Sequence, residues 1–316
     1  MTDRIYYLPI FRRLWRYART STRDGEIYSV RNSWVLLRRA GTIELTDGTK
    51  LPFDASTKSD VVRVMMFALD YGAHFGEGDA EWRLDIPAHL LRTPDGIRFL
   101  LESLNPGIFA ETFLDQIHFV DFDLTGKVVV EGGAYVGDTA LYYAQRGATV
   151  HSFEPDPRTF ALAERNIALN PELSGRIHLH NWAIGKDGEI SFPMAKGDSG
   201  SSSVHDTAPE YARVRSVSVQ TILKECGIER PYLLHLDIKG EEAMVLGDAA
   251  VSAFERVRVE YSPYLLAKTV HQPTLRELLD RLRELGFAQV RVFKHIRSRF
   301  SLEKYGTIDA KKVSPP

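Results

Sequence analysis

The sequence predicts an α/β fold: a doubly wound, mostly parallel β-sheet preceded by a small N-terminal α+β region. From residue 127 onward, short apolar runs alternate with helical stretches, a pattern typical of a parallel sheet covered by helices on both faces. The stretch VVVEGGAYVGDTALYYAQRGATVHSFEPDP also runs from an apolar strand through a Gly-rich turn and a helix to a strand that ends on an acid. Chains that hold a nucleoside are often built in this way.

The expected elements of the sheet follow in chain order. Strands are predicted over residues 127–130, 149–153, 176–181, 232–237, 256–260 and 288–292, with KYGTIDAKKV as one more near the end. Helices are predicted between most of them, over residues 139–145, 158–170, 219–226, 241–246 and 274–285. We therefore expect one α/β domain over residues 121–316.

Residues 1–120 are expected to form an accessory α+β region with no recognisable chemistry. SWVLL and TIELTDGTKLPF are typical of short strands, the latter with Asp47-Gly48 as a hairpin turn. STKSDVVRVMMFALDYGA predicts a helix capped by Ser59 or Asp60, and AEWRLDI a further strand. Residues 7–18 form a basic amphipathic pattern, which favours packing on this chain or on a second copy, or contact with an anionic membrane surface.

Composition excludes several classes of protein. The 316 residues are 44% hydrophobic and 26% charged, with a net charge of −2, as in a soluble globular protein without a global field for nucleic acid. No apolar run is long enough to cross a membrane, and the N-terminus lacks the apolar core of a signal peptide, so a cytoplasmic protein is expected. The single cysteine, Cys226, has no partner for a disulfide, and no local spacing predicts a metal site.

The Gly-rich turn after the first strand predicts a nucleoside site. Gly133 and Gly137 let the backbone approach a ligand closely, and Glu131 directly precedes the turn. Glu154 ends the second strand, where an acid can accept hydrogen bonds from both ribose hydroxyls.

Two cofactors fit a ribose-binding acid. A nicotinamide dinucleotide prefers G-x-G-x-x-G, but here Ala134 replaces the middle glycine and Glu131 is an unwelcome neighbour for pyrophosphate. S-adenosylmethionine has no phosphate and carries an ammonium and a sulfonium, which a carboxylate attracts. Charge therefore favours S-adenosylmethionine and leaves a nicotinamide-dependent dehydrogenase as a poorer alternative.

Several motifs in order resemble those of FkbM-type methyltransferases, within the class I, Rossmann-like, S-adenosylmethionine-dependent fold. The family shows D-x-G-A-x-x-G-D, then F-E-P-x-P, then N-x-x-x-N, and the resemblance covers roughly residues 110–265. Matching residues here are Glu131, Gly133, Ala134, Gly137, Asp138, Phe153, Glu154, Pro155, Asp156, Pro157, Asn166 and Asn170.

The resemblance implies cofactor-binding roles along the ends of three strands. The turn residues would line the methionine end, Glu154 would hold the ribose with Pro155 and Asp156 shaping the turn beside it, and the residues after the third strand would lie near the adenine. The cofactor-binding residues expected on this basis are Glu131, Gly133, Ala134, Gly137, Glu154, Pro155, Asn181 and Ala183, with Trp182 either beside the adenine or in the core.

The fourth strand, YLLHLD, supplies the expected catalytic residues. Asp237 is the first candidate for the general base or acceptor-orienting residue and Glu242 the second. The family usually shows D-x-E-G-x-E here, and Lys239 replaces an acid, which leaves open whether a divalent metal is needed. Glu260, Tyr261 and Ser262 end the fifth strand at the same edge, and His205 follows a Gly/Ser-rich segment, residues 197–203, that is a candidate lid.

These residues favour an S-adenosylmethionine-dependent O-methyltransferase acting on a hydroxyl of a sugar, glycan or small natural product. An N-methyltransferase is an alternative, although the Asn/Asp-Pro-Pro-aromatic tetrapeptide common in such enzymes is absent after the fourth strand. A non-catalytic protein that holds the cofactor is a third reading, motivated by Lys239 and the N-terminal region. No G-x-S-x-G indicates a hydrolase.

Overall fold

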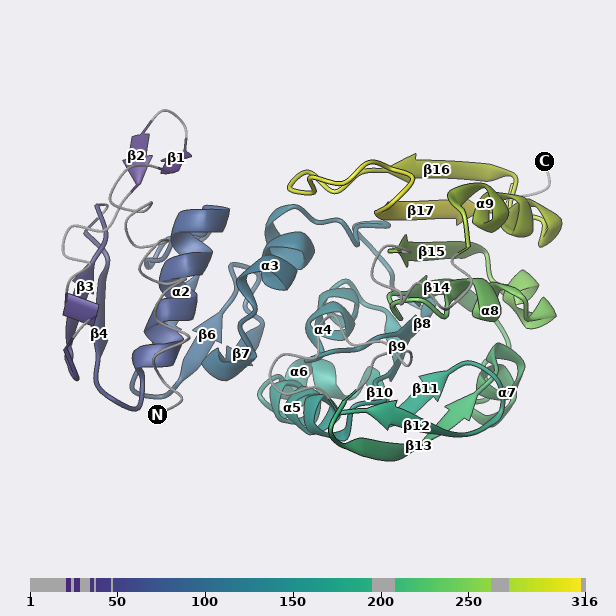
Figure 1. Ribbon diagram of the computed structural model, residues 1–316, viewed down its shortest axis with the longest axis horizontal. Coiled ribbons are helices and arrows are strands. Elements are labelled where there is room, and N and C mark those ends of the chain that lie inside the picture. Colours follow the sequence, from purple (N-terminus) through teal and green to yellow (C-terminus); the bar gives the residue numbers. More distant parts are fainter. Residues whose placement is uncertain are drawn as a thin grey trace. The chain divides into compact units, whose positions relative to one another are not determined.

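A computed structural model describes residues 21–23, 26–28, 35–36, 38–46, 48–194, 208–262 and 273–313 (Figure 1). The chain divides into two compact units, Met1–Gln116 and Ile117–Pro316. The amphipathic pattern of residues 7–18, Asp47, the candidate lid and His205 lie outside the described residues. Within those residues, no helix combines the length and the apolar character needed to cross a bilayer.

The described part of the first unit contains small antiparallel sheets and the 14-residue helix α2. Its strands are β1 (Ser21–Arg23), β2 (Glu26–Tyr28), β3 (Gly41–Glu44), β4 (Lys50–Phe53), β5 (Arg83–Asp85), β6 (Leu90–Arg92) and β7 (Arg98–Leu100). Its helical elements are α2 (Lys58–Tyr71), η2 (Leu101–Ser103), α3 (Pro106–Phe109) and η3 (Ala110–Leu114). β3 and β4 pair antiparallel, which confirms the predicted hairpin strands.

Two local predictions for this unit are wrong. Val35 and Leu36 lie in a 3₁₀ turn instead of a strand. Helix α2 begins at Lys58 after Thr57, so neither Ser59 nor Asp60 caps it. The reason is a turn one step earlier, in which the Asp54 carboxylate accepts hydrogen bonds from the backbone N–H groups of Ser56 and Thr57.

The second unit is built on a seven-stranded sheet in the order β10-β9-β8-β14-β15-β17-β16. These strands are β8 (Val128–Gly132), β9 (Thr149–Phe153), β10 (Ile177–His180), β14 (Pro231–Leu236), β15 (Arg256–Tyr261), β16 (Gln289–Phe293) and β17 (Gly306–Lys311). The first five in spatial order are parallel, and β17 runs antiparallel to both of its neighbours. The predicted doubly wound, mostly parallel sheet is confirmed.

Helices cover both faces of this sheet. In Figure 1, α4 (Asp138–Gln145), α5 (Pro157–Ala168) and α6 (Pro171–Ser174) lie on one side, and α7 (Val219–Glu225), α8 (Glu242–Leu246) and α9 (Leu275–Glu284) on the other, with η4 (Ala249–Ala253) following α8. Local sequence sets where the helices start. Asp156 caps α5 ahead of Pro157, and Thr274 forms a capping box with Glu277 at α9.

The order of the strands creates the ligand-binding edge. From β8 the chain first builds outward to β9 and β10, and later returns to the other side of β8 with β14 and β15. Ligands of such sheets bind beyond the carboxyl ends of the strands where this reversal occurs. The reversal here lies between β8 and β14, so the Gly-rich turn and Asp237 meet at the same place.

The structure also contains a small sheet that the sequence analysis did not predict. β11 (Trp182–Ile184), β12 (Gly188–Pro193) and β13 (Tyr211–Val217) form it in the order β11-β13-β12. β13 pairs parallel with β11 and antiparallel with β12. Its strand β11 begins two residues after the end of β10 and therefore includes Trp182 and Ala183, two of the residues expected near the adenine.

Candidate cofactor and acceptor site

The turn after β8 requires glycine at position 133. Gly133 has a φ of +88°, and a Cβ atom there would lie 2.1 Å from the carbonyl oxygen of Asp237. The backbone N–H groups of Gly133 and Ala134 both donate to the carbonyl oxygen of Phe153, each at 3.0 Å. The turn is thus wedged between the ends of β9 and β14, as expected for a backbone that must approach a ligand closely.

We expect Gly133→Ala to destabilise the protein more than the matched variant Gly126→Ala. Gly126 also has a positive φ, +73°, but a Cβ atom there would meet nothing within 4 Å. The control therefore measures backbone strain alone, about 1–2 kcal/mol, whereas Gly133→Ala adds a clash worth roughly 1–3 kcal/mol. Chemical denaturation of both variants checks this, and equal destabilisation would contradict the close packing of the turn.

A buried asparagine in helix α5 stabilises the same turn through a hydrogen bond. Asn166 in α5 is fully buried, and its Nδ2 donates to the carbonyl oxygen of Val136 at 2.9 Å. Asn170 in turn donates to the carbonyl oxygen of Asn166 at 2.8 Å. Both asparagines belong to the N-x-x-x-N motif quoted above, but the sequence alone assigned them no role. Their role is to hold the carbonyl that precedes Gly137, the residue from which α4 starts with a φ of +81°.

Glu154 lies where a ribose-binding acid is expected. It follows β9 directly and its side chain is 7% exposed. Its Oε2 accepts a hydrogen bond from the N–H of Tyr135 at 2.8 Å, and its Oε1 accepts one from the N–H of Asp156 at 2.9 Å. Each oxygen keeps a second lone pair for a hydroxyl. Burial raises the pKa of Glu154 to about 8, against the effect of the two backbone donors.

The side chain of Glu131 lies in the protein interior. It is fully buried, and its Oε2 accepts a hydrogen bond from the hydroxyl of Ser152 on the neighbouring strand. Its Oε1 lies 3.7 Å from Nδ1 of His235 on β14. Burial, the largest cause, raises the pKa of Glu131 to about 8. In this position the carboxyl group supports the end of β8, and it is neutral at pH 7, unlike the exposed negative charge on which the sequence argument relied.

We expect Glu131→Gln to change the pH dependence of stability. A carboxyl group whose pKa is raised on folding contributes stability that is fully present below its unfolded pKa, near 4.5, and is lost as the pH rises through about 8. Between these values the free energy of unfolding of the wild type should fall relative to Glu131→Gln, by up to about 1.4 kcal/mol per pH unit. Parallel urea denaturation from pH 5 to 9 tests this, and a constant difference would contradict the buried neutral carboxyl.

The residues expected near the adenine differ in their surroundings. Asn181 is half-buried, and its Nδ2 donates to the carbonyl oxygens of Glu154 and Pro155, at 2.8 and 3.2 Å. It therefore fixes the backbone beside the ribose-binding acid. Ala183 is buried within β11. The ring of Trp182 is packed beneath the guanidinium of Arg215, 4.4 Å from its centroid.

A lysine joins two carboxylates at the ends of β14 and β15. Nζ of Lys239 lies 2.5 Å from Oδ1 of Asp237 and 2.5 Å from Oε1 of Glu260. The side chain of Asp237 is 27% exposed, whereas those of Lys239 and Glu260 are 11% and 4% exposed. The two anions hold the pKa of Lys239 well above its usual value, against the effect of burial. The lysine that breaks the family's acidic pattern thus neutralises a pair of carboxylates, of which only Asp237 faces solvent appreciably.

Glu242, the second catalytic candidate, closes a turn. It is 2% exposed, and both carboxylate oxygens accept from the N–H of Gly240, at 3.0 and 2.9 Å. Burial raises its pKa to about 7. These contacts hold the backbone around Lys239, which has a φ of +47°. Tyr261 is buried too, and its hydroxyl donates to the carbonyl oxygen of Leu302.

Comparisons with known proteins agree with this arrangement. A family model described as the methyltransferase FkbM domain matches residues 131–288, half of the chain. Methyltransferase sdnD of Sordaria araneosa is 27% identical over an alignment of length 184, and the match covers 48% of this chain and 71% of that protein.

Two solved structures also show similarity to this chain. The methyltransferase FkbM of Methylobacillus flagellatus KT aligns over 81% of this chain and 60% of its own length, at 14% identity and a TM-score of 0.42. The N-terminal domain of human METTL16, solved in complex with SAH, aligns over 88% of this chain and 90% of its own length, at 13% identity and a TM-score of 0.40. The family match covers the turn, Glu154 and Asp237 together, and the chain therefore belongs to the FkbM methyltransferase family and is an S-adenosylmethionine-dependent methyltransferase.

Proposed function

We propose that this methyltransferase acts on a hydroxyl oxygen of a sugar, a glycan or a small natural product, with Asp237 accepting the hydroxyl proton. The observation that carries the proposal is the Asp237–Lys239–Glu260 cluster at the carboxyl ends of β14 and β15. It puts one partly exposed carboxylate next to the Gly-rich turn, since the carbonyl oxygen of Asp237 is the atom against which Gly133 packs.

The chain's own residues fit the cofactor at two points. The Gly133 turn leaves no room for a side chain, and Glu154 can accept hydrogen bonds from two ribose hydroxyls while keeping its two backbone donors. Asn181 holds the backbone on which Glu154 is carried. When bound, S-adenosylmethionine supplies the activated methyl group.

The remaining requirement is to orient a hydroxyl and remove its proton. Burial and the charge of Glu260 raise the pKa of Asp237, which makes its carboxylate a stronger base, while Lys239 offsets part of this shift. Lys239 also restricts the position of the Asp237 carboxylate, because the two groups lie 2.5 Å apart. Positioning of this kind is the larger share of catalysis in a transfer reaction, and a base adds roughly 10²–10⁴-fold.

The same cluster disfavours an amine as acceptor. At neutral pH most aliphatic amines carry a positive charge, and the ammonium of Lys239 lies beside the carboxylate that such a group would approach. The segment after β14 reads Asp237-Ile238-Lys239-Gly240, without the tetrapeptide common in N-methylating enzymes. A neutral or anionic hydroxyl compound is not repelled by Lys239 and does not require that tetrapeptide.

A paired-acceptor assay tests the proposal. The purified protein is incubated with S-adenosylmethionine and pairs of sugars that differ only in hydroxyl against amine at one position, and S-adenosylhomocysteine formation is measured. We expect turnover with hydroxyl acceptors and a methyl ether in the product by NMR. Methylation of the amine members alone would overturn the choice of oxygen. Cofactor binding without turnover, over a broad panel of hydroxyl and amine compounds, would favour the non-catalytic alternative.

A further inference from the structure

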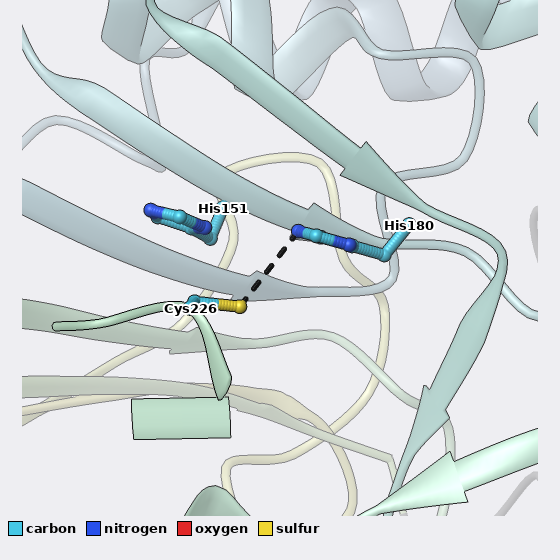
Figure 2. Close-up of side chains that lie close together, drawn as sticks. All are labelled: His151, His180 and Cys226. Carbon is cyan, nitrogen blue, oxygen red and sulfur yellow. Dashed lines mark hydrogen bonds between the residues drawn. The ribbon is translucent and has the colours of Figure 1, made fainter. Parts of the chain in front are cut away.

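Three side chains that can bind a metal ion meet on the sheet face near α7, and none of them belongs to the Asp237 cluster. His151 lies in the middle of β9, His180 ends β10, and Cys226 directly follows α7. One potential ligand atom from each, either an imidazole nitrogen or the sulfur, lies within 4.8 Å of the other two. Sγ of Cys226 is 3.9 Å from Nε2 of His180. Figure 2 shows the two rings and the thiol gathered around a common space.

One nitrogen in this cluster lacks a partner. His151 is 9% exposed, and its Nδ1 has no hydrogen-bond partner among the residues that the structure describes. An unpaired buried polar atom destabilises the folded protein, so its presence beside another imidazole and a thiol needs an explanation. A metal ion would satisfy the nitrogen that the fold leaves unpaired.

The protonation states suit a metal site better than a reactive thiol. Burial lowers the pKa of His151 to about 4 and also lowers that of His180, so both imidazoles are neutral and keep a lone pair at pH 7. Burial raises the pKa of the Cys226 thiol, which makes it a poor nucleophile when no metal is bound. A bound divalent cation would deprotonate the thiol on ligation.

We propose that His151, His180 and Cys226 form a binding site for Zn²⁺, with water as the fourth ligand. Two imidazole nitrogens and a thiolate are ligands that Zn²⁺ prefers, whereas Mg²⁺ and Ca²⁺ prefer oxygen. In tetrahedral coordination the sulfur and a nitrogen lie about 3.6 Å apart, so the observed 3.9 Å needs only a small contraction.

The site was hidden from sequence analysis because its ligands are far apart in the chain. In the parallel pairing of β9 with β10, His151 lies opposite His178. His180 is two residues further along β10, so His151 and His180 point to the same face of the sheet. Cys226 reaches them because α7 covers that face. Bound Zn²⁺ would tie β10 to α7 immediately before Asn181, independently of whether the protein transfers methyl groups to oxygen.

Cobalt substitution tests this proposal directly. The full chain, with any affinity tag removed and metals stripped by a chelator, is titrated with Co²⁺ and followed by electronic absorption. We expect intense d–d bands of low-coordinate Co²⁺ and a thiolate-to-cobalt charge-transfer band, both removed by Zn²⁺. Because the chain contains a single cysteine, that charge-transfer band reports on Cys226 alone. Its absence in the wild type would overturn the proposal.

Variants separate the ligands from their neighbours. Cys226→Ser should abolish the charge-transfer band, and His151→Gln and His180→Gln should each weaken Co²⁺ affinity by more than the roughly 10–100-fold typical of losing a supporting partner. His178→Gln is the matched control, because its exposed ring stacks on His151 at 4.6 Å but is not one of the three ligands. Zn²⁺ should raise the thermal midpoint of the wild type and the control only. Unchanged affinity in both His151→Gln and His180→Gln would contradict the assigned ligands.

Discussion

Asp237→Asn should lower kcat for methyl transfer to a hydroxyl acceptor by about 10²–10⁴-fold, with little change in the affinity for S-adenosylhomocysteine. The amide keeps the size of the carboxylate and can still accept a hydrogen bond, but it cannot take a proton. Nζ of Lys239 retains Glu260 as a partner at 2.5 Å, so the fold of the cluster should survive. Steady-state kinetics and calorimetric titration of the same preparation separate the two effects.

The pH profile distinguishes proton transfer from a structural role. The wild type should show a rising limb in kcat as Asp237 loses its proton, and the variant should lack it. Asp280→Asn, which changes an exposed carboxylate on α9 paired with Arg283, is the matched control and should behave as the wild type. An Asp237→Asn variant within tenfold of wild-type kcat, with its pH profile intact, would contradict the assignment of the base.

The second large effect is expected for Glu154→Ala, which should weaken S-adenosylhomocysteine binding by about 10²-fold or more. Hydrogen bonds donated by two ribose hydroxyls favour the ionised form of Glu154, and to that form they are worth about 1.5–3 kcal/mol each. The variant also leaves the N–H groups of Tyr135 and Asp156 without their acceptor, which loosens the turn that holds the cofactor. Calorimetric titration measures the loss of affinity.

Two further variants separate the loss of the Glu154 charge from the loss of the side chain that supports the turn. Glu154→Gln keeps an acceptor oxygen and should lose less affinity than the alanine variant. Glu164→Gln, at an exposed position of α5, should bind as the wild type. Circular dichroism establishes that each variant is folded. If Glu154→Ala bound with wild-type affinity, the ribose would lie elsewhere and the placement of the cofactor would be wrong.

The main sheet was predictable because its local signals agree with its topology. The strands around residues 129 and 234 are apolar runs bounded by turns, and the glycines at positions 133 and 137 both have the positive φ that the turn needs. The acid that follows β9, Glu154, could be placed from its spacing alone. Elements can be predicted from sequence when their local pattern agrees with their tertiary arrangement.

Other features depend on contacts that a local pattern does not contain. Alternation along the chain does not reveal that β17 inserts antiparallel between β15 and β16. Whether Glu131 faces the turn or the interior depends on the strand pleat and on Ser152 and His235 of the neighbouring strands. Likewise, the sequence shows only that Lys239 replaces an acid. The structure shows that Glu260, on a neighbouring strand, is the second carboxylate that pairs with it.

The most direct test of the central claim is calorimetric titration of the wild-type protein with S-adenosylhomocysteine, with NAD titrated in parallel. We expect one site of micromolar affinity for S-adenosylhomocysteine and no heat of binding with NAD, because the turn around Gly133 and the carboxylate of Glu154 suit a ribose without a pyrophosphate. Binding of NAD in the absence of any response to S-adenosylhomocysteine would contradict it.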